Sequence, residues 1–349
     1  MFLTGADATH DGLLNELALA IGKRERTVVA DLNEGASAFN DVDTLIASVG
    51  IEAFVSFEGL GLQMRLGDAP VFAALGVPLV TLLLEPPYYY PRMLLEPRTD
   101  VAAAWFTHAQ AIQARQLSLG SMTRVGLTPW AIPCSDNRGP IHEPRFDYVV
   151  RANYTPAEEF ALVSAPLEAG IQVVTTELRK RLVEPGTDAL VEFDSLWDRY
   201  GVPHVAATDK RTYPILVALQ EFARHERLLQ WLIALPGASK VAMIGSGWEK
   251  LDSSVPVKAD VQVFNVTSAV DTCDVIESAR CYLDLDTAPT FLVARDLELA
   301  RAAGRQTQSS LPRDGTVSPS AFFEELRYVT DATRVVRSFR EVTSKKAGP

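Results

Sequence analysis

The stretch Val241-Ala242-Met243-Ile244-Gly245-Ser246-Gly247-Trp248 decides the fold that the sequence predicts. Its first four residues are apolar, which is typical of a buried strand. The glycine-bearing turn behind them lets the backbone approach a ligand closely, because glycine has no Cβ and tolerates positive φ. The structural alternative is an ordinary bend in which Trp248 packs as a core aromatic. A GxGxxG dinucleotide fingerprint is not formed, since position 250 is Lys250, so no nicotinamide cofactor is expected.

Short apolar strands alternate with helical segments on both sides of this stretch, which predicts an α/β fold with parallel sheets covered by helices. Strands are expected at 27–30, 53–57, 79–84, 103–107, 146–152, 241–244, 261–264 and 281–285. Helices are expected at 13–21, 42–49, 109–117, 270–279 and 291–303, and the region 157–235 is largely helical in pattern. The chain has 349 residues, a length that suits two domains of about 150 residues each.

Composition shifts divide the chain into four parts. An N-terminal domain is expected over 1–134, and a polar linker with proline and glycine over 135–145. A C-terminal domain follows over 146–318, and helices are expected over 319–349.

The charge balance argues against several classes of partner. There are 33 Lys and Arg residues against 44 Asp and Glu residues, a formal net charge of −11, and no basic cluster that would neutralise a run of nucleic-acid phosphates. A local peripheral contact with a membrane stays open. The N-terminus lacks a basic and then apolar leader, no apolar run is long enough to span a bilayer, and the three cysteines are interpreted as reduced thiols. A cytoplasmic protein is therefore expected.

Four segments of the second domain share their order and spacing with the motifs of a known family. They are the strand 146–154, the turn 245–248, the strand 281–286 and the segment 289–304; the segment 76–90 adds a weaker match in the first domain. In these segments the chain resembles bacterial glycosyltransferases of the spore-maturation-protein type, a GT-B group.

The resemblance implies two Rossmann-like domains facing a cleft, with the C-terminal helices packing back on the N-terminal domain. It also implies transfer of a sugar from a nucleotide-sugar donor to a hydroxyl acceptor, with no required metal or cofactor. The chain departs from the family motifs at Glu85-Pro86-Pro87, at Tyr90 and at Ala294, where the family carries a DHP triplet and two histidines. A catalytically inactive nucleotide-binding or accessory protein is therefore a second reading.

The expected helix 291–303 is a candidate diphosphate site. Its first N–H groups and its positive dipole end would face the donor, with Thr290 and Phe291 at the helix start. Arg295 would make a forked contact with phosphate, and Glu298 or Asp296 would accept hydrogen bonds from ribose hydroxyls. The alternative for Arg295 is a surface ion pair with a neighbouring acid.

The remaining donor candidates lie on other elements. Arg227 shares a helix face with Arg224 and would reach phosphate, unless these arginines pair with Glu221 or Glu226 instead. The full set of expected donor-binding residues is Gly245, Ser246, Gly247, Trp248, Asn265, Thr267, Thr290, Phe291, Arg295, Glu298 and Arg227.

A general base must accept the proton of the acceptor hydroxyl, and it is expected from the first domain. Glu85 and His108 are the candidates, because both follow predicted strands whose carboxyl ends face a ligand. The alternatives are a solvated strand end for Glu85 and a helix N-cap or packed core histidine for His108. Tyr88, Tyr89 and Tyr90 would offer rings to an acceptor sugar, although packing is an equally simple role for them.

Asp284-Leu285-Asp286 matches the DxD motif with which GT-A enzymes hold a divalent ion on the donor phosphates. Strand alternation would place both aspartates on one face. A metal-dependent transferase is thus a further alternative, disfavoured because the motif is short and lies inside a GT-B-like segment.

Overall fold

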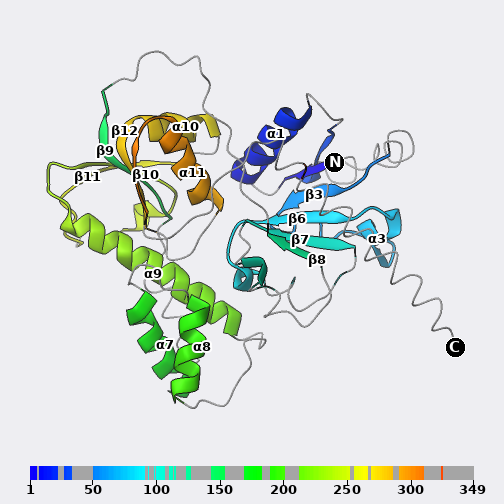
Figure 1. Cartoon of the computed structure of the whole chain (residues 1–349), viewed down its shortest axis with the longest axis horizontal. Helices are drawn as coiled ribbons and strands as arrows, with labels where there is room; N and C mark the ends of the chain where they lie inside the picture. The colour runs from blue at the N-terminus through cyan, green and yellow to red at the C-terminus, as the bar shows by residue number, and fades with distance from the viewer. Residues whose placement is uncertain are drawn as a thin grey trace. The chain divides into compact units, whose positions relative to one another are not determined.

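Figure 1 shows a computed structural model of the chain, which divides into two compact units. The first unit contains residues 1–130 and 316–349, and the second unit contains residues 131–315. The structure describes residues 1–5, 8–22, 27–33, 50–90, 93, 98, 100–106, 110–112, 114, 123–126, 143–153, 169–182, 189–200, 212–251, 255–265, 269–285, 291–309 and 324. No helix within these ranges combines the length and the apolar character needed to cross a bilayer.

The described part of the first unit is built on a parallel sheet with the strand order β2-β1-β3-β6-β7-β8. Its strands are β1 (Phe2–Thr4), β2 (Val29–Asp31), β3 (Phe54–Phe57), β6 (Leu79–Leu83), β7 (Val101–Trp105) and β8 (Thr123–Gly126). Every residue of β3, β6 and β7 is buried, as near-continuous apolar strands covered on both faces require.

The strand order of the first unit is that of flavodoxin-like sheets, and it reverses between β1 and β3. Helix α1 (Ala8–Gly22) follows β1 and buries Leu13, Leu14 and Leu17. The hairpin β4 (Arg65–Leu66) and β5 (Ala69–Pro70), with helix α3 (Val71–Leu75), carries the chain from β3 to β6. Sheets of this order bind ligands at the strand carboxyl ends where the order reverses, which here are the carboxyl ends of β1 and β3.

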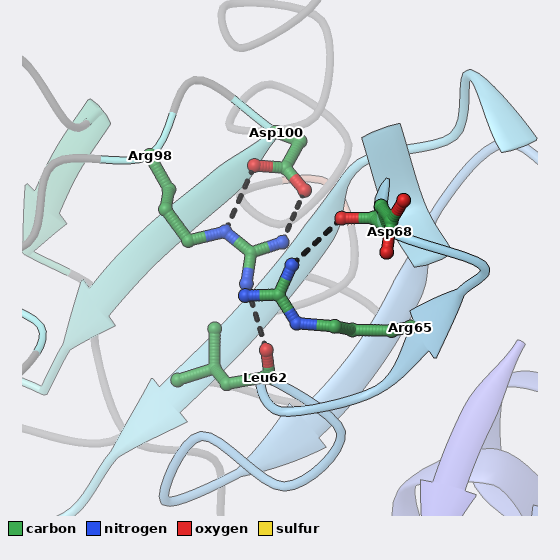
Figure 2. Close-up of polar contacts among 5 residues, drawn as sticks. All are labelled: Leu62, Arg65, Asp68, Arg98 and Asp100. Atoms are coloured by element: carbon green, nitrogen blue, oxygen red, sulfur yellow. Dashed lines mark hydrogen bonds and ion pairs between the residues drawn. The ribbon is translucent and has the colours of Figure 1, made fainter. Parts of the chain in front are cut away.

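Arg98 connects the loop that follows β3, at Leu62, to the residue before β7, Asp100, by hydrogen bonds (Figure 2). Its Nε and Nη2 donate to the two carboxylate oxygens of Asp100, at 3.0 and 2.5 Å, and its Nη1 donates to the Leu62 carbonyl at 2.7 Å. Arg65 closes the neighbouring hairpin by donating to the Asp68 carbonyl at 2.8 Å. The backbone carbonyl of Asp100 accepts the N–H of Leu79 at 2.9 Å. This backbone hydrogen bond joins the first residue of β6 to the residue before β7.

The second unit contains a parallel sheet with the order β11-β10-β9-β12-β13. Its strands are β9 (Phe146–Arg151), β10 (Lys240–Ile244), β11 (Asp260–Phe264), β12 (Ala279–Asp284) and β13 (Gln306–Ser309). In chain order this is 3-2-1-4-5, the order of the dinucleotide-binding Rossmann sheet, and it reverses between β9 and β12.

Alternation along β10 divides the second core into two layers. Ala242 and Ile244 face one cluster with helices α10 (Ala269–Glu277) and α11 (Phe291–Ala302). Val241 and Met243 face the other cluster, with Leu228 and Leu232 of helix α9 (Thr212–Ala234). Helices therefore cover both faces of the sheet, as a doubly wound fold requires.

Helices form the described residues between 169 and 234, which lie between β9 and β10 in the chain. They are α7 (Ala169–Leu182), α8 (Ala189–Tyr200) and α9 (Thr212–Ala234). The 23 residues of α9 reach from α7 and α8 at one end to the sheet at the other (Figure 1). Arg181 of α7 pairs with Glu192 of α8 at 2.7 Å, and Arg179 lies 3.8 Å above the ring of Phe222 in α9.

The predicted α/β fold with parallel sheets is confirmed. Three strands of these sheets were missed: β1, β8 and β13. Strand β1 is only three residues long, and β13 reads Gln-Thr-Gln-Ser, a polar edge strand without an apolar run. The helices expected over 42–49 and 319–349 fall outside the described residues, apart from Glu324.

The cysteines differ from expectation at one position. Cys281 is a buried free thiol, as predicted, and burial raises its pKa. Cys273 is disulfide-bonded, so the expectation of a reduced thiol is wrong there. Disulfides are more typical of oxidising compartments than of the cytosol, and the cytoplasmic location stays a prediction.

Candidate functional site

The topology of the second unit predicts a ligand site at the carboxyl ends of β9 and β12. Open α/β sheets bind ligands outside the carboxyl ends of their strands, at the point where the strand order reverses. Strand β9 ends at Arg151 and continues into Ala152 and Asn153, whereas β12 ends at Asp284. The turn 245–248 follows the neighbouring strand β10 and lies at the same edge.

Gly245 is required by packing between two strands. A Cβ at this position would lie 2.0 Å from the Ala152 carbonyl oxygen and 3.0 Å from Asn153 Oδ1, so no larger residue fits. The Ala152 N–H also donates to the Ile244 carbonyl at 3.0 Å. The close approach that the sequence suggested for a ligand is thus made here by the adjacent strand.

Trp248 is a core residue. Gly247 adopts a left-handed conformation, with φ of 85°, and opens the short 3-10 helix η3 (Trp248–Lys250). Trp248 is 7% exposed, belongs to the core cluster that also contains Leu228 and Val150, and donates from Nε1 to the Ala152 carbonyl at 2.9 Å. The ring therefore serves packing, as the structural alternative held, and a ligand contact at this position is left to the backbone.

Asn153 holds the turn from the neighbouring loop, and sequence reasoning missed it. Its Oδ1 accepts the backbone N–H of Ser246 at 3.0 Å and the Ser246 hydroxyl at 3.3 Å. The Ser246 N–H is thereby engaged within the protein, which corrects its expected role as a direct phosphate donor. A polar residue directly after an apolar strand was the signal that would have identified Asn153.

Helix α11 is attached to the end of β9 by a buried ion pair. Arg151 Nε lies 2.5 Å from Asp296 Oδ2, and Arg151 Nη2 donates to Asp296 Oδ1 at 3.3 Å. The Tyr282 hydroxyl of β12 donates to the same carboxylate at 3.3 Å. Asp296 is fully buried, so its expected contact with ribose is wrong: this carboxylate fixes the helix to the sheet instead.

The other residues of α11 separate into a buried and an exposed face. Arg295 is 2% exposed, which contradicts the surface ion pair considered for it. Glu298 forms an ion pair with Arg301, three residues further along the helix. The carboxylate that was expected to accept hydrogen bonds from ribose hydroxyls is therefore paired within the helix. Phe291 begins the helix as predicted.

The remaining candidates are spread over several elements. Arg227 is 8% exposed on α9, and Arg224 pairs with Glu221 at 2.7 Å, which confirms one alternative considered for that arginine. Asn265 is exposed directly after β11. Thr267, Thr290 and His108 lie outside the described residues.

Asp284 of the DxD motif is 3% exposed at the end of β12, and Asp286 lies outside the described residues. A carboxylate that is buried in this way is poorly placed to hold an ion on donor phosphates. The burial gives no support to the metal-dependent alternative.

A hollow of about 390 Å³ lies at the opposite edge of the second sheet. Asp147, Ser239 and Arg280 line it, at the amino ends of β9, β10 and β12. Because doubly wound sheets bind ligands at the carboxyl ends, this hollow is not the candidate site.

In the first unit, Glu85 belongs to a network centred on another carboxylate. Its backbone N–H donates to the Tyr90 hydroxyl at 3.0 Å, and that hydroxyl donates to Glu58 Oε1 at 2.7 Å. The Leu84 N–H donates to the same Oε1 at 3.0 Å. Burial raises the pKa of the Glu58 carboxyl, and burial beside Glu58 and Glu85 raises the pKa of Tyr90 well above its usual range.

Comparison of the sequence with protein-family models and with curated proteins finds no match. The function is therefore inferred from the residues of this chain.

Proposed function

We propose that this chain is a GT-B-type glycosyltransferase, which moves a sugar from a nucleotide-sugar donor to a hydroxyl acceptor. The second unit binds the donor nucleotide at the crevice between the carboxyl ends of β9 and β12. One observation carries the proposal: the Rossmann strand order β11-β10-β9-β12-β13, with Asn153 and Asn265 exposed at its carboxyl edge.

The start of α11 supplies the diphosphate contacts in this proposal. Unsatisfied N–H groups and the positive end of the helix dipole favour anions at a helix start. The ion pair between Arg151 and Asp296 holds the first turns of α11 against the sheet, so these N–H groups are fixed before the donor binds. Fixed donors stabilise the charge that develops on a departing diphosphate without reorganising.

The reaction needs one proton transfer. The acceptor O–H bond breaks as its oxygen bonds to the anomeric carbon, and the proton passes to a general base. The bond from the anomeric carbon to the diphosphate oxygen breaks. The nucleoside diphosphate leaves with the bonding electrons. No metal is assigned a role, and the nucleotide-sugar is a substrate.

The second candidate function is a nucleotide-binding protein that has lost transfer. The engagement of the Ser246 N–H by Asn153 and the burial of the Trp248 ring favour it, because both remove ligand contacts that the turn was expected to offer. Binding of a nucleotide without turnover of any nucleotide-sugar carrying it would support this candidate.

A thermal-shift screen tests the proposal. UDP, GDP, dTDP, CDP, ADP and CMP are added to the full chain, with and without Mn²⁺, and one nucleotide is expected to raise the melting temperature. At 100 times its Kd a ligand stabilises the folded state by about 2.7 kcal/mol. The corresponding nucleotide-sugars are then tested for release of the nucleotide. Absence of any shift across the panel contradicts the proposal.

A further inference from the structure

The hollow at the amino edge of the second sheet has the size of a small-molecule site. Its volume is about 390 Å³, and ligand pockets typically measure about 300–1,000 Å³. Every residue that lines it belongs to the second unit. The hollow lies at the opposite edge of the sheet from the proposed nucleotide site, so the two ligands would not compete for space.

Two opposite charges line the hollow without bonding to each other. Asp147 of β9 and Arg280 of β12 lie opposite each other on neighbouring strands, and Asp147 Oδ1 is 3.9 Å from Arg280 Nη1. This distance is too long for a hydrogen bond. Asp147 Oδ2 accepts the Lys240 N–H at 3.0 Å, which fixes the carboxylate. Asp147 Oδ1 and the Arg280 guanidinium therefore offer one anionic and one cationic contact to the same ligand.

Two uncharged polar side chains line the hollow beside these charges. The backbone of Ser239 is already engaged, because its N–H donates to the Pro236 carbonyl at 3.0 Å and its carbonyl accepts the Asp260 N–H at 2.9 Å. Within the described part of the chain, neither the Ser239 hydroxyl nor the Gln306 amide forms a hydrogen bond. Both groups can therefore donate to a ligand or accept from it.

The hollow also has an apolar wall. Cys281 of β12 lies in register between Tyr148 of β9 and Gln306 of β13, so these three side chains form a row across adjacent strands. Tyr148 is held by an edge-on contact with Trp231, with the ring centroids 5.4 Å apart, and Pro236 lines the hollow beside it. This wall suits a ligand with an apolar side chain, and the free thiol of Cys281 marks the site chemically.

We infer that this hollow binds a free α-amino acid with an apolar side chain. The α-carboxylate accepts hydrogen bonds from the Arg280 guanidinium, and the α-ammonium donates to Asp147 Oδ1. The side chain of the amino acid lies along Tyr148. One molecule thus satisfies both charges that the protein leaves 3.9 Å apart. The site goes beyond the proposed function, and neither proposal requires the other.

Calorimetric titration of the full chain tests the inference with L-leucine, L-methionine and L-phenylalanine as probes. We expect at least one of them to bind at concentrations up to about 10 mM. Two analogues of the amino acid that binds each lack one charge. Its N-acetyl derivative lacks the ammonium, and its amide derivative lacks the carboxylate. Each should bind about tenfold or more weakly, because a hydrogen bond to a charged group is lost.

Two variants assign the charges to their partners. Asp147→Asn keeps an oxygen that accepts the Lys240 N–H but removes the charge, and Arg280→Met keeps the aliphatic stem. Each should weaken binding of the amino acid about tenfold or more. Asp147→Asn should not weaken the N-acetyl derivative further, and Arg280→Met should not weaken the amide derivative further. The control is Lys258→Gln, an exposed charge outside the lining, whose affinity should equal that of the wild type.

Labelling of Cys281 with iodoacetamide locates the bound amino acid. Mass spectrometry of the labelled peptide should show slower reaction of the thiol when the amino acid is present. Failure of all three amino acids to bind the wild type overturns the inference, and so does binding that survives both Asp147→Asn and Arg280→Met. The thermal shift caused by a nucleotide should be the same in these variants as in the wild type, so the failure of one proposal leaves the other standing.

Discussion

Arg151 and Asp296 are 145 residues apart in the chain, and their side chains form a buried ion pair that joins the end of β9 to α11. Arg151 Nε lies 2.5 Å from Asp296 Oδ2, and the two side chains are 15% and 0% exposed. Removing one partner of such a pair leaves an uncompensated buried charge.

Single substitutions of this pair are therefore expected to destabilise the second unit strongly. Asp296→Leu and Arg151→Met should each lower the free energy of unfolding by about 3–5 kcal/mol. The double variant Arg151→Met with Asp296→Leu should lose less than the sum of the single losses, because no charge is left unpaired. Denaturant unfolding of all four proteins measures this double-mutant cycle. Additive losses would show that the pair is not coupled.

A glycine pair offers a matched test of the packing between β9 and β10. Gly245→Ala should cost about 3 kcal/mol of stability, because its Cβ would lie 2.0 Å from the Ala152 carbonyl oxygen. Gly237→Ala should be nearly neutral, since its Cβ would meet nothing closer than Lys258 Cβ at 3.6 Å. Urea denaturation compares the two variants. Equal losses would contradict the steric explanation.

Asn153 allows charge and hydrogen bonding to be separated at the proposed donor site. Asn153→Asp keeps an oxygen that accepts from the Ser246 N–H and hydroxyl, so the melting temperature without ligand should change little. The added negative charge should repel a diphosphate and weaken nucleotide binding about tenfold or more. Calorimetric titration with the nucleotide chosen by the thermal screen measures the change.

The control for that titration is Arg280→Ala, at the amino end of β12, where the side chain is 67% exposed. Its nucleotide affinity should equal that of the wild type. If Asn153→Asp also binds with wild-type affinity, the nucleotide does not occupy the crevice between β9 and β12.

Glu58→Gln is expected to gain stability at neutral and alkaline pH. Burial raises the folded-state pKa of this carboxyl above its unfolded value. The favourable contribution of the protonated form is therefore present below the unfolded pKa and is lost as pH rises through the folded pKa. The neutral amide does not titrate, so the advantage of the variant should be largest at pH 8 and shrink toward pH 4. Thermal unfolding across this range measures it, and a pH-independent difference would contradict the assigned burial.

Local patterns identified the secondary structure and the class of fold. The apolar runs of β6, β7 and β10 predicted buried parallel strands, because burial on both faces requires continuous apolar sequence. The donor-site residues were predicted less well. Ser246 and Trp248 were placed correctly behind β10, but the partners that engage them, Asn153 and the Ala152 carbonyl, lie more than 90 residues earlier in the chain.

The sequence by itself determined the alternation of strands and helices, since apolar periodicity and glycine turns act over a few residues. Tertiary structure alone decided the strand orders β2-β1-β3-β6-β7-β8 and β11-β10-β9-β12-β13, and with them the two edges where polar residues gather. It also brought Leu84 and Tyr90, 26 and 32 residues away in the chain, to donate hydrogen bonds to Glu58. Burial and long-range hydrogen bonds set the pKa of a carboxylate, and neither can be predicted from the residues next to it in the chain.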